Sequence, residues 1–284
     1  MSNMMPIVRV QIRRLWAKKE FWIALALSMV FVSIGFVELC LHFVGADRSA
    51  IPTAAAAWVA NMDSLLIYSM HLYFFLFVFI LSSMAFGDAL YLDATSGHIQ
   101  HMLSRCSVRT YVMATALVAF AAGFLVVALP LALSQALSFL VFPASGEAWQ
   151  FSGNLLSPLQ DYTWIRSHAA QALFPDLLYE APYAYNLVFI VYDSLWGGLA
   201  AVVSIAVSCC VRKSRLVVVG APTFVFLLTF FLFTGVFPLQ YYLYPNTVYV
   251  PLSPLLFLIA PLIVGGASVA VLLVRSSRRG DLFL

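Results

Sequence analysis

The stretch YVMATALVAFAAGFLVVALPLALSQALSFLVF occupies residues 111–142 and contains no charged side chain. At about 1.5 Å per residue, a helix of this length would extend roughly 48 Å, which exceeds the hydrocarbon thickness of a bilayer. The stretch therefore predicts a membrane-spanning helix that tilts, kinks at Pro130 or begins in the cytoplasm. Two short spans in place of one long helix are the alternative.

The rest of the chain has the same apolar character. Of its 284 residues, 63% are hydrophobic and only 10% are charged, and the mean hydropathy is +0.96. Soluble domains are about 45–50% apolar and about 25% charged, so this chain has too few charges to cover a surface in water. The composition excludes a free-standing soluble enzyme, a nucleic-acid-binding protein and a disordered chain, and it predicts an integral protein of the lipid bilayer.

Six segments are long and apolar enough to cross a membrane as helices. They lack the two-residue alternation of a lipid-facing barrel, and backbone groups in lipid must otherwise be satisfied within helices. We therefore expect an all-α integral membrane protein with a single transmembrane domain over residues 1–284. The predicted spans are 21–44, 64–86, 111–142, 184–209, 216–237 and 254–274.

Basic residues predict the orientation of these spans. Thirteen of the fifteen Lys and Arg residues lie in segments that six spans would place on one side, and only Arg48 and Arg166 fall on the other. Cytoplasmic segments carry an excess of Lys and Arg. We therefore expect both termini in the cytoplasm of a multi-pass protein of the cell membrane, of the kind found in a bacterial plasma membrane.

The segment before the first span, residues 4–20, has the pattern of an amphipathic helix. Its apolar residues Met5, Val8, Ile12, Leu15 and Trp16 recur at helical spacing, and its basic residues lie on other faces. A basic helix with a Trp on its apolar side favours the membrane interface at the anionic cytoplasmic leaflet. A plain basic flank of the first span is the alternative.

The segment between the second and third spans is also two-faced. A short helix over residues 98–106 would place Ile99 and Met102 on one side, and His98 and His101 on the other. It is too short to span the bilayer, so we expect it to lie across the cytoplasmic surface as a handle for a soluble partner. The side chains on the apolar face of this helix are Ile99, Met102, Leu103 and Cys106, and those on the polar face are His98, His101 and Arg105.

The residues around this short helix form a pattern that resembles the permease subunits of type-2 ATP-binding-cassette (ABC) exporters. That resemblance covers the layout of the whole chain and, at the level of residues, the region from Asp88 to Tyr111; Cys106 stands where family members often carry Pro. It implies a coupling-helix loop over 91–109 that docks on a separate cytoplasmic ATPase. The residues of the pattern are Asp93, Gly97, Leu103, Arg105, Ser107 and Tyr111.

The resemblance also implies partners and roles. It predicts a second permease subunit, identical or related, and an ATPase subunit that binds the ATP and Mg²⁺. The predicted outer loop over 143–183 is longer than the resemblance leads us to expect, whereas the last outer segment, 238–253, fits the re-entrant short helices of the family. In the coupling loop, Gly97 would permit a tight turn, and Arg105 would enter an acidic groove of the ATPase. The residues expected to carry coupling are Asp93, Gly97, Leu103, Arg105 and Arg109.

The chain has no phosphate-binding loop of its own. Such a loop needs a Lys after a Gly, and the only lysines here are Lys18, Lys19 and Lys213, none of which follows a glycine. We therefore expect that the chain binds no ATP or other cofactor, and that it is no enzyme by itself. No metal site is expected either, because His98 and His101 lack a second pair of ligands.

Polar residues inside the predicted spans form a further candidate site. Their positions put most of them roughly 9–14 Å below the outer end of their spans. Intramembrane polar groups usually face a bundle interior, which favours a polar belt along a translocation pathway. The alternative is a structural role, with Glu38 bonded to His71. The candidate residues are Glu38, His42, His71, Gln135 and Asp193.

Two functions remain open at this point. The first is a permease subunit of an ATP-driven exporter. The second is an ATP-independent multi-pass protein, such as a secondary transporter or a structural or signalling subunit. Internal repeats, which many secondary transporters contain, are not found in this sequence. The sequence identifies no substrate.

Overall fold

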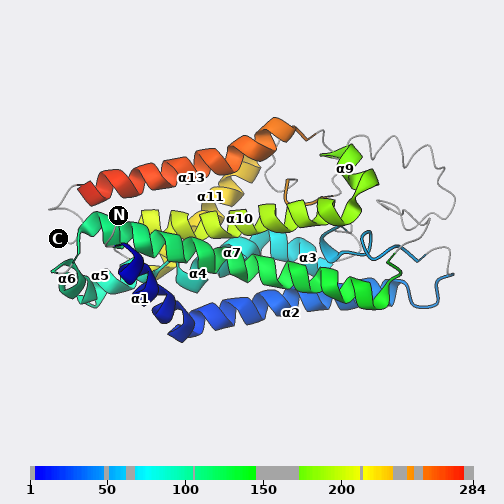
Figure 1. Cartoon of the computed structure of the whole chain (residues 1–284), viewed down its shortest axis with the longest axis horizontal. Coiled ribbons are helices and arrows are strands. Elements are labelled where there is room, and N and C mark those ends of the chain that lie inside the picture. The colour runs from blue at the N-terminus through cyan, green and yellow to red at the C-terminus, as the bar shows by residue number, and fades with distance from the viewer. Residues whose placement is uncertain are drawn as a thin grey trace.

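In the computed structural model, every regular element among the described residues is a helix (Figure 1). The predicted all-α class is therefore confirmed for this part of the chain. The described residues are 4–47, 51–61, 68–104, 106–144, 173–211, 214–232, 242–245 and 252–277.

The helices fall into a long and a short group. The long helices run along the molecule, and the short ones lie mostly near its two ends (Figure 1). The long helices are α2 (Lys19–His42), α7 (Val108–Val141), α10 (Pro182–Ser208), α11 (Arg215–Leu232) and α13 (Pro254–Ser277). The shorter elements are α1 (Met4–Ala17), η2 (Val59–Asn61), α3 (Tyr68–Leu72), η3 (Tyr73–Phe77), α4 (Val78–Phe86), α5 (Ala89–Thr95), α6 (His98–Leu103) and α9 (Pro175–Glu180).

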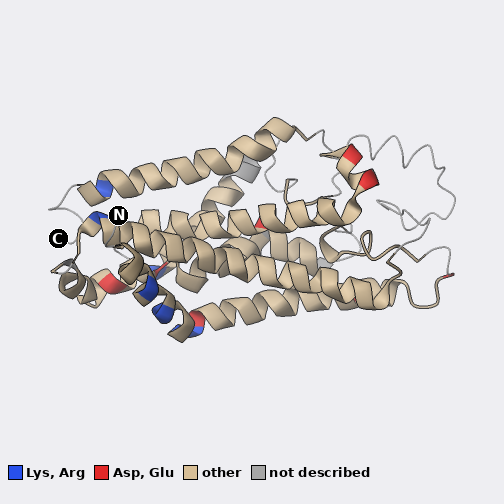
Figure 2. Ribbon diagram, in the orientation of Figure 1, with Lys and Arg blue, Asp and Glu red and all other residues tan. Residues whose placement is uncertain are grey.

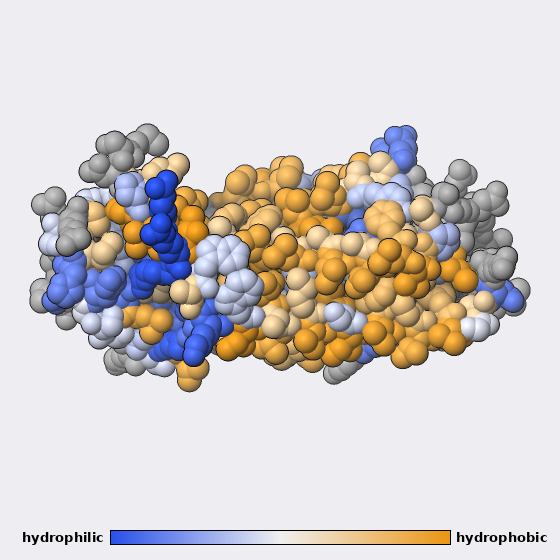
Figure 3. Space-filling model, turned by 60° about the horizontal axis from the view of Figure 1, so that its bottom comes forward, coloured by the Kyte–Doolittle hydropathy of each residue, from blue (hydrophilic) through white to orange (hydrophobic). Residues whose placement is uncertain are grey.

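Several helices have the length and composition to cross a membrane. Among the described residues these are α2, α7, α10 and α13, and α4 with α5 makes a fifth if the 42° bend between them lies within one span. The outward-facing side chains agree with this assignment, because apolar residues cover the middle of the face seen in Figure 3 and hydrophilic residues gather at the end that carries α1. The chain thus has the architecture of a multi-pass membrane protein.

Two of the six predicted spans, 64–86 and 216–237, are not seen as single helices over their full predicted length. For span 64–86, helical backbone continues from Tyr68 to Phe86, but it is divided into α3, the π-helical turn η3 and α4. For span 216–237, α11 is helical to Leu232. The remaining residues of both spans, 64–67 and 233–237, lie outside the described residues. The count of six spans therefore stays a prediction.

The longest apolar stretch forms one helix. α7 continues through Pro130 from Val108 to Val141, so the alternative of two short spans is wrong. The helix begins at Ser107, whose side-chain oxygen accepts a hydrogen bond from the Thr110 backbone N–H. Because α7 starts before the predicted span, its first turn extends towards α5 and α6 (Figure 1).

The predicted amphipathic helix at the start of the chain is present as α1. It ends at Ala17, and the extended backbone of Lys18 separates it from α2, which sets the two helices at an angle (Figure 1). One face of α1, with Ile7, Gln11 and Leu15, is buried against the bundle. The opposite apolar residues Met5, Ile12 and Trp16 are exposed, where they are free to contact lipid.

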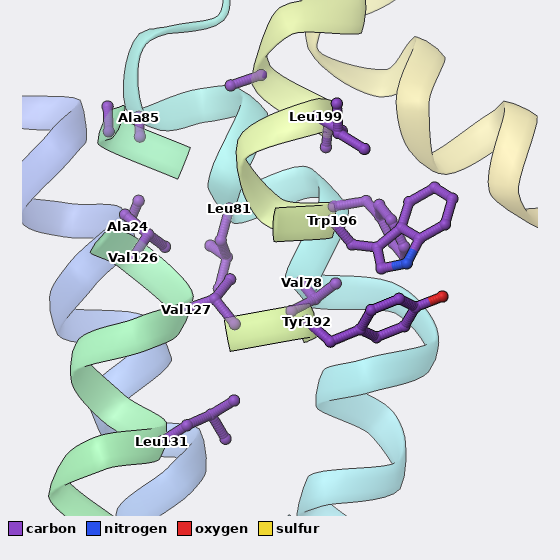
Figure 4. Packing of buried hydrophobic residues seen from close by; sticks show 14 of the residues in the cluster. Ala24, Val78, Leu81, Ala85, Val126, Val127, Leu131, Tyr192, Trp196 and Leu199 are labelled. Atoms are coloured by element: carbon purple, nitrogen blue, oxygen red, sulfur yellow. The ribbon is translucent and has the colours of Figure 1, made fainter. Parts of the chain in front are cut away.

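The bundle is held together by small residues between α7 and α10. A Cβ atom placed on Gly123 would lie 2.4 Å from the carbonyl oxygen of Gly197, so the two backbones meet directly. Around this crossing, Val126 of α7 lies beside Ala24 of α2, and Val127 lies close to Leu81 of α4 (Figure 4). Small residues at such crossings allow the close backbone approach that stabilises helix pairs in lipid.

Charged residues divide between the two ends of the bundle. Lys and Arg gather at the end that carries α1, α5 and the last turn of α13, whereas α9 at the opposite end carries Asp176 and Glu180 (Figure 2). This distribution follows the predicted basic and acidic sides. The coupling-helix loop lies at the basic end, and α9 is the only helix among the described residues of the predicted outer loop 143–183.

Candidate functional site

The basic end of the bundle is organised around two buried aspartates. Asp93 of α5 is 1% exposed and pairs with Arg14 of α1, whose Nη1 lies 3.0 Å from Oδ2 of the carboxylate. The hydroxyl of Tyr111, in the first turn of α7, donates to the same carboxylate. Asp93 therefore joins three elements that are far apart in the sequence.

A second contact reinforces this junction. Gln11 of α1 is fully buried; its Nε2 donates to Thr115 Oγ1 of α7 at 3.0 Å, and its Oε1 accepts from Arg14 at 2.9 Å. Burial, the largest single effect, would lower the pKa of Arg14, but the hydrogen bonds and electrostatic interactions with Asp93 and Tyr111 together outweigh it and raise the pKa. The guanidinium is therefore held in its charged form between α1 and α5.

The other buried aspartate, Asp88, binds two cations from different parts of the chain. It is 0% exposed and accepts from Lys18, at the break between α1 and α2, and from Nε of Arg215 at 2.6 Å. Arg215 begins α11 and also donates to Glu20 of α2 at 2.7 Å. Breaking a buried pair of this kind leaves an uncompensated charge and costs about 3–5 kcal/mol.

These contacts fix α5 to four other helices. Through Asp93 it is bound to α1 and α7, and through Asp88 its N-terminal end is bound to the start of α2 and to α11. A displacement of α5 would therefore act on several helices of the bundle at once. We call this set of ion pairs and its hydrogen-bonded neighbours the basic-end network; its members are Gln11, Arg14, Lys18, Glu20, Asp88, Asp93, Tyr111, Thr115 and Arg215.

The predicted coupling helix follows α5 after a tight turn. Gly97 has a φ of +73°, so the predicted turn at this glycine is confirmed. The helix itself is α6, which is shorter than the predicted 98–106. Its two faces are as expected where they are described: Ile99 is buried, whereas His98 and His101 are exposed.

Beside α6 lies an open groove of about 1020 Å³. It is lined by residues of α1, α5 and α6, and the paired side chains of Arg14 and Asp93 form part of its wall. Arg109, another residue predicted to carry coupling, is exposed at the start of α7. The side chain of Leu103 and the whole of Arg105 lie outside the described residues. The groove is lined by Val10, Arg14, Leu92, Asp93, Thr95, Ser96, His98, His101 and Met102.

The predicted polar residues of the outer half have separate surroundings. Glu38 accepts from the backbone N–H and the hydroxyl of Ser69, at 3.3 and 2.7 Å. The ring of His71 lies 3.2 Å from the hydroxyl of Tyr244, measured from Nδ1. His42, one turn after Glu38, is exposed. The bond of Glu38 to Ser69 fits the structural role, although with a partner other than His71.

Gln135 belongs to a buried amide cluster that was not predicted. Its Nε2 donates to the Ala54 carbonyl at 3.0 Å, and its Oε1 accepts from Asn186 of α10 at 2.7 Å. Asn61 in turn donates to the Asn186 side chain at 2.8 Å. These amides satisfy backbone carbonyls of residues 52–61, a buried segment that inserts between α7 and α10.

Asp193 stands apart from the other polar residues. It lies within α10, is 0% exposed, and neither carboxylate oxygen has a hydrogen-bond partner among the described residues. The five polar residues predicted to share one belt thus occupy distinct surroundings, and their role in a pathway stays a prediction. In the described part of the chain, no group of three or more His, Cys, Asp or Glu side chains is arranged to hold a metal ion.

Sequence reasoning missed Asp88 and the pairing of Arg14 and Lys18. One signal was available, because Arg14 and Lys18 are four residues apart in a helical pattern and so share a face. Two carboxylates, Asp88 and Asp93, follow the second apolar segment on the same side of the membrane. Buried Gln11, within the apolar spacing of α1, also indicates that this helix faces protein on one side.

No protein-family model, curated protein or solved structure matches the chain. The resemblance to exporter permeases therefore rests on the residue pattern and on the layout of the chain. Three residues of that pattern have defined structural roles: Gly97 forms the turn before α6, and Asp93 and Tyr111 bond to each other within the basic-end network.

Proposed function

We propose that the chain is the membrane-spanning permease subunit of an ATP-driven exporter. In this proposal α2, the helical run from Tyr68 to Phe86, α7, α10, α11 and α13 make six crossings, with both termini in the cytoplasm. Two permease subunits, identical or related, surround the substrate pathway. ATP and Mg²⁺ are bound by a separate cytoplasmic ATPase subunit.

The basic-end network is the observation that carries the proposal. A coupling element must be exposed to its partner and also firmly joined to the helices that move. α6 is exposed through His98 and His101, and the adjacent α5 is joined by buried charges to α1, α2, α7 and α11. A plain connecting loop has no need for two buried aspartates that each bind cations from other helices.

The mechanism follows from this connection. A partner that binds α6 more tightly in one conformation of the bundle shifts the population towards that conformation. Displacement of α6 is passed to α5 across Gly97, and from α5 through Asp93 and Asp88 to the basic ends of the membrane helices. The substrate pathway then opens outwards. The groove beside α6 supplies the surface for a projecting element of the ATPase.

The test is the isolation of the intact complex. We expect the tagged chain, extracted from its native membrane in a mild detergent, to carry an ATPase with a phosphate-binding loop and vanadate-sensitive ATP hydrolysis. Two charge reversals, Arg105→Glu at a predicted coupling residue and His101→Glu on the exposed face of α6, should each reduce the co-purified ATPase at least about tenfold, which corresponds to a loss of roughly 1.4 kcal/mol in binding.

The matched control is Arg9→Glu, which makes the same charge reversal on an exposed position of α1. This variant should insert and retain the ATPase as the parent does. If the parent carries no ATPase, or if both coupling variants retain it fully, the exporter proposal is wrong. The ATP-independent multi-pass protein then becomes the better description.

A further inference from the structure

Asp193 occupies a site that the exporter proposal does not use. It lies near the middle of α10, and both of its carboxylate oxygens are without a hydrogen-bond partner among the described residues. An ionised carboxylate in such surroundings is strongly unfavourable unless a cation or a proton neutralises it. The question is which of these the surroundings of Asp193 can supply.

The helices packed around α10 offer no basic partner. α4 carries no titratable side chain, and α5 and α9, which also pack on α10, carry no Lys, Arg or His. The basic residues of the other helices packed on α10 lie at helix ends: Arg109 in the first turn of α7, Arg215 at the start of α11 and Arg275 in the last turn of α13; Tyr111, also in the first turn of α7, is bonded to Asp93. Two buried phenols, Tyr73 of η3 and Tyr192 of α10, belong to this part of the bundle, and neither hydroxyl has a hydrogen-bond partner among the described residues. A phenol is neutral at physiological pH, so neither tyrosine provides a counter-charge.

A metal cation is a poor fit because the site has too few oxygen ligands. Hard divalent cations take about six to eight oxygen ligands in calcium sites, and about six in magnesium sites. Among the described residues, Asp193 belongs to no group of three or more His, Cys, Asp or Glu side chains, and its own two carboxylate oxygens have no polar partner. A proton needs only one carboxylate oxygen, and the resulting acid can donate to a neighbouring hydroxyl.

The backbone beside this site is irregular in a way that supports a functional role. Tyr73 begins the π-helical turn η3, in which the backbone N–H of Val78 donates to the Tyr73 carbonyl. π-helical turns within α-helices are rare and occur frequently at functional sites. Tyr73, at the start of this turn, is fully buried, and its hydroxyl, like that of Ser28 in α2, has no hydrogen-bond partner among the described residues.

We propose that Asp193 is an intramembrane proton-binding site. The carboxylate takes up one proton to become the neutral acid, and no bond other than this O–H bond forms or breaks. In the closed packing of α10 against α4, the acid is shielded from water. Movement of α10 away from η3 exposes the acid, and its proton then exchanges with solvent. The site is independent of whether an ATPase drives the chain.

Infrared spectroscopy of the full chain in lipid nanodiscs tests this proposal directly. At neutral pH we expect a carboxylic-acid C=O band, because ionised carboxylates absorb elsewhere. The band should be lost in Asp193→Asn and kept in Asp176→Asn, which changes an exposed aspartate in the same way. In heavy water the band should shift to lower frequency as the proton exchanges.

Isotope-labelled aspartate in the unaltered chain keeps the test valid if Asp193→Asn fails to fold. The acid band should then shift with the label, which assigns it to an aspartate without any substitution. Absence of an acid band at neutral pH would overturn the proposal, because Asp193 would then be ionised and paired. A band that never shifts in heavy water would overturn it as well, since a sealed acid exchanges no proton.

Discussion

At the scale of single residues, the basic end depends on how Asp88 and Asp93 are neutralised. Each buried carboxylate loses its hydration and regains contacts from cationic side chains on other helices. Replacing buried pairs with apolar residues is often neutral, whereas removing one partner is costly. These pairs therefore fix the position of α5, because they form only when α5 lies within reach of both α1 and α11.

The first prediction concerns Asp93. Asp93→Asn keeps the volume of the side chain but removes the charge that Arg14 and Tyr111 bind. We expect a stability loss of about 1–3 kcal/mol, at the lower end because Arg14 is partly exposed to water. The midpoint of thermal unfolding in detergent, followed by Trp fluorescence, measures it. Asp176→Asn on exposed α9 is the control, and an equal change in both variants would contradict the role of Asp93.

The second prediction concerns the pH dependence at Glu20. Partial burial, the largest single effect, would raise the pKa of Glu20. The hydrogen bond from Arg215, a backbone hydrogen bond and the charges of Lys18 and Arg215 together outweigh it and lower the pKa below the usual 4.5. A carboxylate whose pKa is lower in the folded than in the unfolded state stabilises the fold fully above the unfolded pKa. This stabilisation disappears as the pH falls through the folded pKa.

Glu20→Gln should therefore unfold at a lower temperature than the parent at neutral pH. As the pH falls below 4.5 and through this lowered pKa, the two midpoints should converge, because Glu20 of the parent is then becoming protonated. Glu180→Gln, at an exposed position of α9, should match the parent at neutral and at acid pH. A gap between Glu20→Gln and the parent that stays constant down to acid pH would show that the charge of Glu20 plays no part.

At the scale of elements, the crossing of α7 and α10 decides how the bundle closes. Gly123 and Gly197 let the two backbones touch, and residues 52–61 fill the space between these helices nearer the acidic end. The amide cluster of Asn61, Gln135 and Asn186 supplies the hydrogen bonds that this buried segment needs. The helix pair α7 and α10 is thus held by close packing of small residues at the glycine crossing and by the hydrogen bonds of the amide cluster further along.

The third prediction uses this crossing. A methyl group at Gly123 would lie 2.4 Å from a backbone oxygen, so Gly123→Ala must push α7 away from α10 and should cost about 1–3 kcal/mol. Gly266→Ala, in α13, meets no atom within 4 Å and should be neutral or stabilising by up to about 1 kcal/mol. The measurement is the midpoint of thermal unfolding of each variant. Equal midpoints for Gly123→Ala and Gly266→Ala would mean that α7 and α10 do not pack as closely as described.

At the scale of the whole molecule, apolar residues cover the middle of the face seen in Figure 3, and basic residues mark one end of the bundle (Figure 2). The same end holds the basic-end network and α6, whereas α9 lies at the other. With Lys and Arg retained in the cytoplasm, α6 should be reached from inside the cell and α9 from outside.

The fourth prediction tests this orientation. In a chain whose four free cysteines are replaced, His98→Cys and Asp176→Cys each introduce one exposed thiol on α6 and α9. In intact cells a membrane-impermeant maleimide should label only Asp176→Cys, whereas opened cells should show labelling of both variants. Labelling of His98→Cys in intact cells would place the coupling helix outside and would contradict the exporter proposal.

Local patterns were enough to predict most of the helices. Apolar length located α2, α7, α10 and α13, and the glycine at position 97 indicated the turn before α6. The basic-end network and the amide cluster were not predictable in this way. Arg14 and Asp93 are 79 positions apart, and Asp88 and Arg215 are 127 apart. Hydropathy and helical periodicity contain no information about pairs at such separations.

The sequence by itself determined an all-helical chain with several membrane-spanning segments and a basic side, because burial in lipid and helical spacing act through neighbouring residues. Only the tertiary structure decided which charges meet, that residues 52–61 are buried in the bundle, and that Asp193 has no described partner. These features depend on the distances between helices, which are set by side-chain packing across the whole bundle.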